Sequence, residues 1–75
     1  MISPNWRDTP NSSQVAGFGY DQASRILTVK FNTGAVYDYM EVPDTVFDGM
    51  RAAQSTGSYF IKNVKRAGYT FKRRP

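Results

Sequence analysis

The chain has 75 residues, of which 40% are hydrophobic and 15% aromatic, and it carries a formal net charge of +4 without cysteine or histidine. This length allows one small hydrophobic core, and the missing residue types exclude disulfides, thiolate chemistry and the usual histidine proton shuttle. No apolar run approaches the roughly 20 residues of a membrane span and the first residues do not resemble a signal peptide, so we expect a cytoplasmic protein that does not enter a membrane.

The charge is divided unevenly along the sequence. Residues 1–50 contain three basic and six acidic side chains, whereas residues 51–75 contain seven basic side chains and no acidic one. This asymmetry is typical of a surface that faces a polyanion. A solvated surface that only maintains solubility would give the same pattern.

Residues 1–12 are predicted to form a flexible N-terminal arm. They are rich in Pro, Asn, Ser and Thr, and Pro4 and Pro10 both disfavour regular structure. Trp6, next to Arg7, has two interpretations. It could stack on a nucleobase, or it could fold back over its own domain, which is the commoner arrangement.

Residues 13–20 are predicted to form the first strand. Val15 and Phe18 do not have the parity of a regular strand face. A bulge at Gly17 would bring both side chains to the same face.

Two further strands are predicted over residues 25–31 and 35–41. Residues 25–31 show the clearest alternation, in which one face consists of Leu27, Val29 and Phe31. The two strands are separated by Asn32-Thr33-Gly34, where Gly34 is expected to adopt a positive φ. An antiparallel meander of three strands follows.

Val42-Pro43 ends the third strand, because proline cannot donate a hydrogen bond to a sheet and suits a first helical turn. Asp44 then begins a helix, favoured there by the helix dipole. The core face of this helix is predicted to contain Val46, Phe47, Met50 and Ala53.

A second helix is predicted from about Tyr59 to Ala67, with Ser58 as its N-cap. Three cations with i, i+3 and i+4 spacing should share its outer face: Lys62, Lys65 and Arg66. Residues 69–71 are predicted to be extended, and residues 72–75 form a basic tail.

These elements predict an α+β domain in which a three-stranded antiparallel β-meander is followed by two α-helices packed on one face of the sheet. The strand and helix stripes must meet, so the most buried side chains should include Leu27, Val29, Phe31, Phe47 and Met50.

Several short motifs resemble the KTSC domain family in their order and spacing. They are Gly19-Tyr20-Asp21, Leu27-x-Val29-x-Phe31, Gly34-x-Val36-Tyr37-x-Tyr39, Val42-Pro43 and Ser55-x-Gly57-x-Tyr59-Phe60. The resemblance covers most of residues 12–73 and assigns residues 13–75 to a KTSC-like domain. This small domain occurs alone in bacterial and phage proteins and at the C-terminus of some lysyl-tRNA synthetases.

The resemblance implies a β-meander with helices and a link to RNA, and it supplies no catalytic residues. The sequence departs from the family at Ile61, where an Asn commonly follows the Tyr-Phe pair. If that amide contributes to a ligand site in the family, it is absent here.

The residues offer little for catalysis. Without His or Cys, the base beside a nucleophile would have to be Lys, Asp or Glu, and the acidic residues are scattered over a turn, a strand and a helix start. Glu41 and Asp44 could meet a hard cation, but a charge at a helix start is the simpler interpretation. We therefore expect a protein that is not an enzyme and needs no cofactor or metal.

The sequence instead favours a non-catalytic binding module for nucleic acid, with RNA as the first choice. In this hypothesis an exposed tyrosine, Tyr37 or Tyr39, stacks on a base. The phosphates are contacted by Lys62, Lys65, Arg66, Arg73 and Arg74. The alternative for the tyrosines is a structural role in the core.

Two other functions remain open. One is a small protein–protein interaction or inhibitor module, which a phage could encode. The other is a binder of a small anionic nucleotide. Salt distinguishes these hypotheses, because nucleic-acid binding weakens steeply as salt rises and an apolar protein interface need not.

Overall fold

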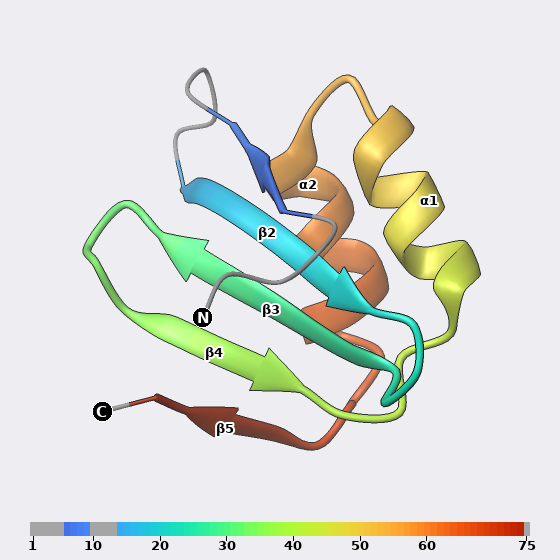
Figure 1. The fold of residues 1–75 in the computed structure, drawn as a ribbon. Coiled ribbons are helices and arrows are strands. Elements are labelled where there is room, and N and C mark those ends of the chain that lie inside the picture. The colour runs from blue at the N-terminus through green and yellow to red at the C-terminus, as the bar shows by residue number, and fades with distance from the viewer. Residues whose placement is uncertain (1–5, 10–13, 75) are drawn as a thin grey trace.

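Five antiparallel strands form one sheet, in the order β1-β2-β3-β4-β5. This computed structural model describes residues 6–9 and 14–74. The strands are β1 (Arg7–Asp8), β2 (Val15–Asp21), β3 (Ile26–Phe31), β4 (Val36–Tyr39) and β5 (Phe71–Arg73). The helical segments are α1 (Asp44–Ala52), α2 (Thr56–Phe60) and the π-helix η1 (Ile61–Lys65). Figure 1 shows the helices on one face of the sheet.

The predicted α+β class is confirmed, but the predicted number of three strands is wrong. β1 lies within the predicted arm and pairs with β2, while β5 lies within the extended segment and basic tail and pairs with β4. Strands of two or three residues are too short for side-chain alternation to reveal them. They form because the longer strands beside them offer unpaired backbone groups. Residues 1–5 and 10–12 of the predicted arm lie outside the described residues.

The predicted bulge in β2 is confirmed. The register between β2 and β3 shifts between Val15 and Gly17, and both Val15 and Phe18 are buried in the core. Trp6 lies against this bulge, since a Cβ built on Gly17 would be 2.7 Å from the ring atom Cζ2. The indole Nε1–H donates to Asp8 Oδ1 at 3.0 Å. Trp6 therefore folds back over its own domain.

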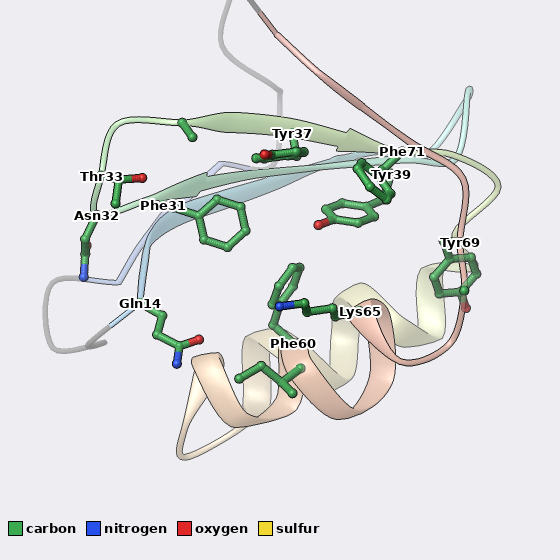
Figure 2. A pocket seen from close by; sticks show the side chains of 13 residues that line it. Gln14, Phe31, Asn32, Thr33, Tyr37, Tyr39, Phe60, Lys65, Tyr69 and Phe71 are labelled. Carbon is green, nitrogen blue, oxygen red and sulfur yellow. The ribbon is translucent and has the colours of Figure 1, made fainter.

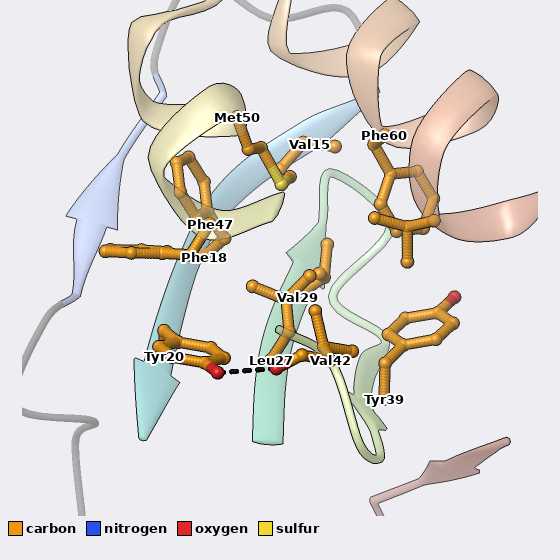
Figure 3. Packing of buried hydrophobic residues seen from close by; sticks show 11 residues of the cluster. Val15, Phe18, Tyr20, Leu27, Val29, Tyr39, Val42, Phe47, Met50 and Phe60 are labelled. Carbon is orange, nitrogen blue, oxygen red and sulfur yellow. Dashed lines mark hydrogen bonds between the residues drawn. The ribbon is translucent and has the colours of Figure 1, made fainter. Parts of the chain in front are cut away.

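The connection from β4 to α1 is fixed at Val42, which is fully buried. Its backbone N–H donates to the carbonyl oxygen of Arg25 at 2.9 Å, and its own carbonyl oxygen accepts a hydrogen bond from the Tyr20 hydroxyl (Figure 3). Helix α1 begins directly afterwards at Asp44, as predicted. The hairpin between β3 and β4 also follows the prediction, because Gly34 has a φ of 94°.

The core lies between α1, α2, η1 and the helix-facing side of the sheet (Figure 3). Of the five residues predicted to be most buried, four are buried: Leu27, Val29, Phe47 and Met50. The prediction is wrong for Phe31, which is only partly buried. Phe31 is the last residue of β3, where the sheet and the helices enclose a pocket instead of a closed core.

The second helix begins three residues before the predicted position. Ser55 is its N-cap, because the Ser55 hydroxyl accepts a hydrogen bond from the backbone N–H of Ser58 at 3.3 Å. After Phe60 the helix widens into η1, and Arg66 N–H donates to the Ile61 carbonyl oxygen at 3.1 Å, five residues back. Such a widened turn is rare and often accompanies a functional site.

Candidate functional site

A pocket of about 830 Å³ lies between the sheet and the π-helix η1 (Figure 2). It opens where strands β3, β4 and β5 come opposite η1. Six of its thirteen lining residues are aromatic: Phe31, Tyr37, Tyr39, Phe60, Tyr69 and Phe71.

Strand pairing brings the sheet aromatics to one face. Tyr37 and Tyr39 are two residues apart in β4, and Phe71 of β5 pairs directly with Tyr39. Residues two apart on a strand, and residues opposite each other on neighbouring strands, share a face. The rings of Tyr39 and Phe71 are consequently 5.6 Å apart, and those of Tyr37 and Phe71 are 5.7 Å apart.

Phe60 closes the pocket from the helical side. Its ring meets Phe31 at 5.4 Å with an interplanar angle of 72°, and it meets Tyr39 at 5.5 Å with an angle of 73°. Phe60 and Tyr39 are buried, whereas the Phe71 side chain is 57% exposed. Phe60 and Tyr39 therefore form the deep part of the pocket, and Phe71 forms part of its rim.

One cationic side chain lines the pocket. Lys65 extends from η1 beside Phe60 in Figure 2, and no carboxylate belongs to the lining among the residues that the structure describes. Arg73 pairs with Tyr37 across β4 and β5, so it projects from the same face of the sheet as the pocket. Polar groups complete the wall at the far end, where Gln14 and Asn32 lie.

Both predicted tyrosines line this pocket, but they differ in exposure. Tyr37 is half-buried, which leaves part of its ring accessible. The prediction that Tyr39 is an exposed stacking residue is wrong, because it is only 7% exposed beneath Phe60 and Phe71. Burial, with a smaller contribution from Tyr37, raises the pKa of the Tyr39 hydroxyl, which keeps it protonated at neutral pH.

The predicted cations do not form one continuous patch. Lys62, Lys65 and Arg66 are exposed on the helical segment, and only Lys65 lines the pocket. Arg74 is directed to the opposite face of the sheet, where its Nε–H donates to Asp38 Oδ2 at 2.8 Å. The separation arises because Asp38 alternates with Tyr37 and Tyr39 along β4 and so faces away from the pocket.

Asp38 is the centre of a small polar network on the face of the sheet opposite the pocket. The Thr28 hydroxyl donates to Asp38 Oδ1 at 2.6 Å, opposite the contact with Arg74. Burial by itself would raise the pKa of Asp38, but the hydrogen bonds from Arg74 and Thr28, together with the Arg74 charge, lower it below its usual value. The network fastens β5 to β4 and β3.

Four aromatic residues of the pocket were not predicted as site residues: Phe31, Phe60, Tyr69 and Phe71. Phe31 was assigned to the core face of its strand, Phe60 to the second helix, and Tyr69 and Phe71 to an extended segment before a basic tail. The signal for Phe71 is an aromatic side chain beside a run of cations, where no core stripe accounts for it. Ile61, which departs from the expected Asn, also lines the pocket and makes this part of its wall apolar.

The described residues contain no group of three or more acidic, His or Cys side chains arranged to hold a metal ion. None of the helices in residues 6–9 and 14–74 is long and apolar enough to cross a bilayer.

Comparison with known proteins places the chain in a family. The KTSC domain family matches residues 11–69. A protein of Tsukamurella paurometabola is 50% identical over 54 residues, which cover 72% of this chain and 81% of that protein. An uncharacterized protein of Stutzerimonas stutzeri is 37% identical over 62 residues, covering 83% of this chain and 87% of its own length.

A lysine–tRNA ligase of Nostoc punctiforme is 38% identical over 56 residues, which cover 75% of this chain but only 10% of the ligase. The crystal structure of a KTSC domain protein from Yersinia pestis has the same fold, with a TM-score of 0.83, 24% identity and coverage of 95% of this chain and 97% of that one. The chain belongs to the KTSC domain family.

Proposed function

We propose that this KTSC domain is a non-catalytic module that binds single-stranded nucleic acid, with RNA as the preferred partner. The observation that carries the proposal is an aromatic pocket lined by the cation Lys65 and, among the described residues, by no carboxylate. Aromatic rings that stack on bases and cations that contact phosphates are the two components of single-strand recognition.

The distribution of unpaired cations supports this proposal. Arg51 and Arg74 form ion pairs with Asp48 and Asp38, respectively. In the described part of residues 51–75, the cations that form no ion pair are Lys62, Lys65, Arg66, Lys72 and Arg73. Lys62, Lys65 and Arg66 belong to the helical segment and Arg73 to the pocket-facing side of β5, whereas Lys72 is the strand partner of Asp38 and lies on the opposite face of the sheet. Releasing counterions from phosphates at these positions would contribute to affinity.

The relatives give independent support of a weaker kind. Several are lysine–tRNA ligases, enzymes whose name identifies tRNA as a substrate, and this domain matches a tenth of their length. A domain of the same family in an RNA-handling enzyme is compatible with RNA contact here.

A small anionic nucleotide is a second candidate ligand, and the size of the pocket favours it. The volume of about 830 Å³ lies within the range of about 300–1,000 Å³ that is usual for small-molecule sites. The two candidates differ in their dependence on ligand length. Affinity for a mononucleotide would equal that for an oligonucleotide, whereas the proposed strand-binding surface gains affinity as phosphates are added.

The test measures binding of a fluorescent single-stranded RNA by anisotropy at several salt concentrations. Each lost phosphate contact should reduce the log–log salt slope by about 0.7, so the triple variant Lys62→Gln, Lys65→Gln and Arg66→Gln should flatten it by about 2. The melting midpoint should stay near that of the wild type, because all three side chains are exposed.

The matched control removes three exposed cations outside residues 51–75: Arg7→Gln, Arg25→Gln and Lys30→Gln. This variant has the same net charge as the first and should retain most of the wild-type slope. An equal reduction of the salt slope in both variants would show that net charge alone attracts the RNA and would contradict the proposed surface. Absence of saturable binding by the wild type at low salt would refute the function itself.

A further inference from the structure

We infer that the aromatic pocket holds one unstacked base of the bound RNA, and that Phe71 at its rim packs against that base. This inference rests on the proposed function and assigns a role to one cavity within it.

The first argument is the arrangement of the rings. Phe31 meets Phe60 at 72° and Tyr37 at 81°, and Tyr39 meets Phe60 at 73°. These three contacts are edge-to-face, whereas Tyr37 and Tyr39 are stacked, with ring centroids 6.4 Å apart and an interplanar angle of 30°. The pocket of about 830 Å³ leaves space beside the rings, and Figure 2 shows the aromatic side chains of the sheet and of the helical segment directed into it. A flat heterocycle fits this geometry better than a bulky aliphatic group.

The second argument is the exposure of Phe71. Among the large hydrophobic residues in the described part of the chain, Phe71 is the exposed one, at 57%. Its ring already contacts Tyr37 and Tyr39 from β5. A base entering between Phe71 and η1 would cover the exposed part of the ring and gain a stacking surface in the same step.

The third argument is charge complementarity. Lys65 is the charged group in the wall, and Arg73 projects from the same face of the sheet. A nucleotide carries a phosphate on the sugar that bears its base, and these two cations, one in the wall and one on the same face of the sheet, are available to that phosphate. An uncharged aromatic ligand would make no use of them, and a nucleotide within a strand uses both the rings and the cations.

The experiment compares a short single-stranded RNA with the same strand made abasic, which keeps the phosphates and loses the bases. For the wild type, the intact strand should bind more tightly by about 5–100-fold, the range expected when one or more stacked bases are lost. Phe71→Ala should weaken binding of the intact strand by about 5–100-fold without altering the salt slope, and it should leave binding of the abasic strand unchanged.

Two further variants keep the result interpretable. Phe71→Tyr retains a ring at the rim and should bind like the wild type. It therefore shows that the ring is what binding requires, even if Phe71→Ala also loosens β5. Ile26→Ala truncates a half-buried apolar side chain of β3 that alternates with the core residue Leu27 and so faces away from the pocket, and it should leave affinity unchanged.

The outcomes separate this inference from the proposed function. If the intact and abasic strands bind equally and Phe71→Ala has no effect, the pocket does not hold a base, although RNA binding stands. If the wild type binds neither strand, the proposed function and the inference both fail. A wild-type dimer that Phe71→Ala dissociates, or an acidic aromatic peptide that binds where RNA does not, would assign the pocket to another occupant and overturn the inference.

Discussion

Gly49 is the position where a single methyl group should report on the packing between α1 and α2. Alanine in the interior of a helix ordinarily stabilises it by about 1 kcal/mol relative to glycine. Here, however, a Cβ would lie 2.5 Å from Cζ and 2.9 Å from Cε2 of Tyr59, and it would be closer still to the hydroxyl oxygen. Carbon atoms in contact are normally about 3.5–4.0 Å apart, so the Tyr59 ring would have to move off α1.

The magnitude follows from two opposing contributions. Overpacking of this kind costs about 1–3 kcal/mol, so Gly49→Ala should change the free energy of unfolding by between about 0 and 2 kcal/mol in the destabilising direction. In a Tyr59→Ala background the obstruction is absent, and the same substitution should stabilise the domain by about 1 kcal/mol. The coupling energy between the two positions is therefore about 1–3 kcal/mol.

The assay is urea unfolding of the wild type, the two single variants and the double variant, followed by circular dichroism. Tyr59→Phe serves as a further background, because it keeps the ring and removes only the hydroxyl, and it should retain part of the coupling. Additivity of the two single effects within about 0.5 kcal/mol would mean that Tyr59 does not rest on Gly49, and the packing described for α1 and α2 would be refuted.

Three other predictions follow from the core, the hairpin and the polar network around Asp38. Leu27→Ala, in a fully buried side chain, should lower the free energy of unfolding by about 2–5 kcal/mol, and an unchanged melting midpoint would contradict the assigned strand face. Gly34→Val should destabilise the protein by more than an ordinary surface change, because a β-branched residue resists the φ of 94°, and thermal melting beside Thr33→Val provides the comparison. The pKa of Asp38 is lowered in the folded protein, so its ionised form contributes stability above the unfolded pKa of about 3.9 that disappears as the pH falls through the folded pKa. Asp38→Asn should therefore destabilise the domain at neutral pH and flatten the decline of the melting midpoint below about pH 5, and an unchanged acid limb would show that the contact with Arg74 contributes nothing.

The parts of the fold that the sequence predicted are those with repeated local signals. Leu27 and Val29 alternate with polar residues, Gly17 explains the broken parity of Val15 and Phe18, and Val42-Pro43 marks the change from strand to helix. β1 and β5 give no such signal, because a strand of two or three residues is stabilised by its neighbour and not by its own pattern. The π-helix is likewise invisible in the sequence, since the same residues satisfy an α-helical stripe.

For the pocket, the sequence predicted the direction of side chains but not their burial. Parity placed Tyr37 and Tyr39 on one face, but the depth of each depends on Phe60 and Phe71, which arrive from other segments. Similarly, the run of cations before Pro75 gave no indication that Arg74 would face away from Arg73 and pair with Asp38. Sequence spacing specifies the direction of a side chain within its own element, whereas burial and ion pairing depend on which distant elements pack against it.

The shortness of β1 and β5 has a consequence for self-association. These two strands are the edges of the sheet, and an exposed edge is a template on which another chain can pair and aggregate. An edge of two or three residues offers little length to such a neighbour, and the cations Lys72 and Arg73, which point to opposite faces of β5, add repulsion. Removal of β5 would instead expose β4, and its two tyrosines and the adjoining aromatic pocket would then form an exposed hydrophobic sheet edge. The pairing of β5 with β4 thus covers the edge of the sheet next to these aromatic side chains.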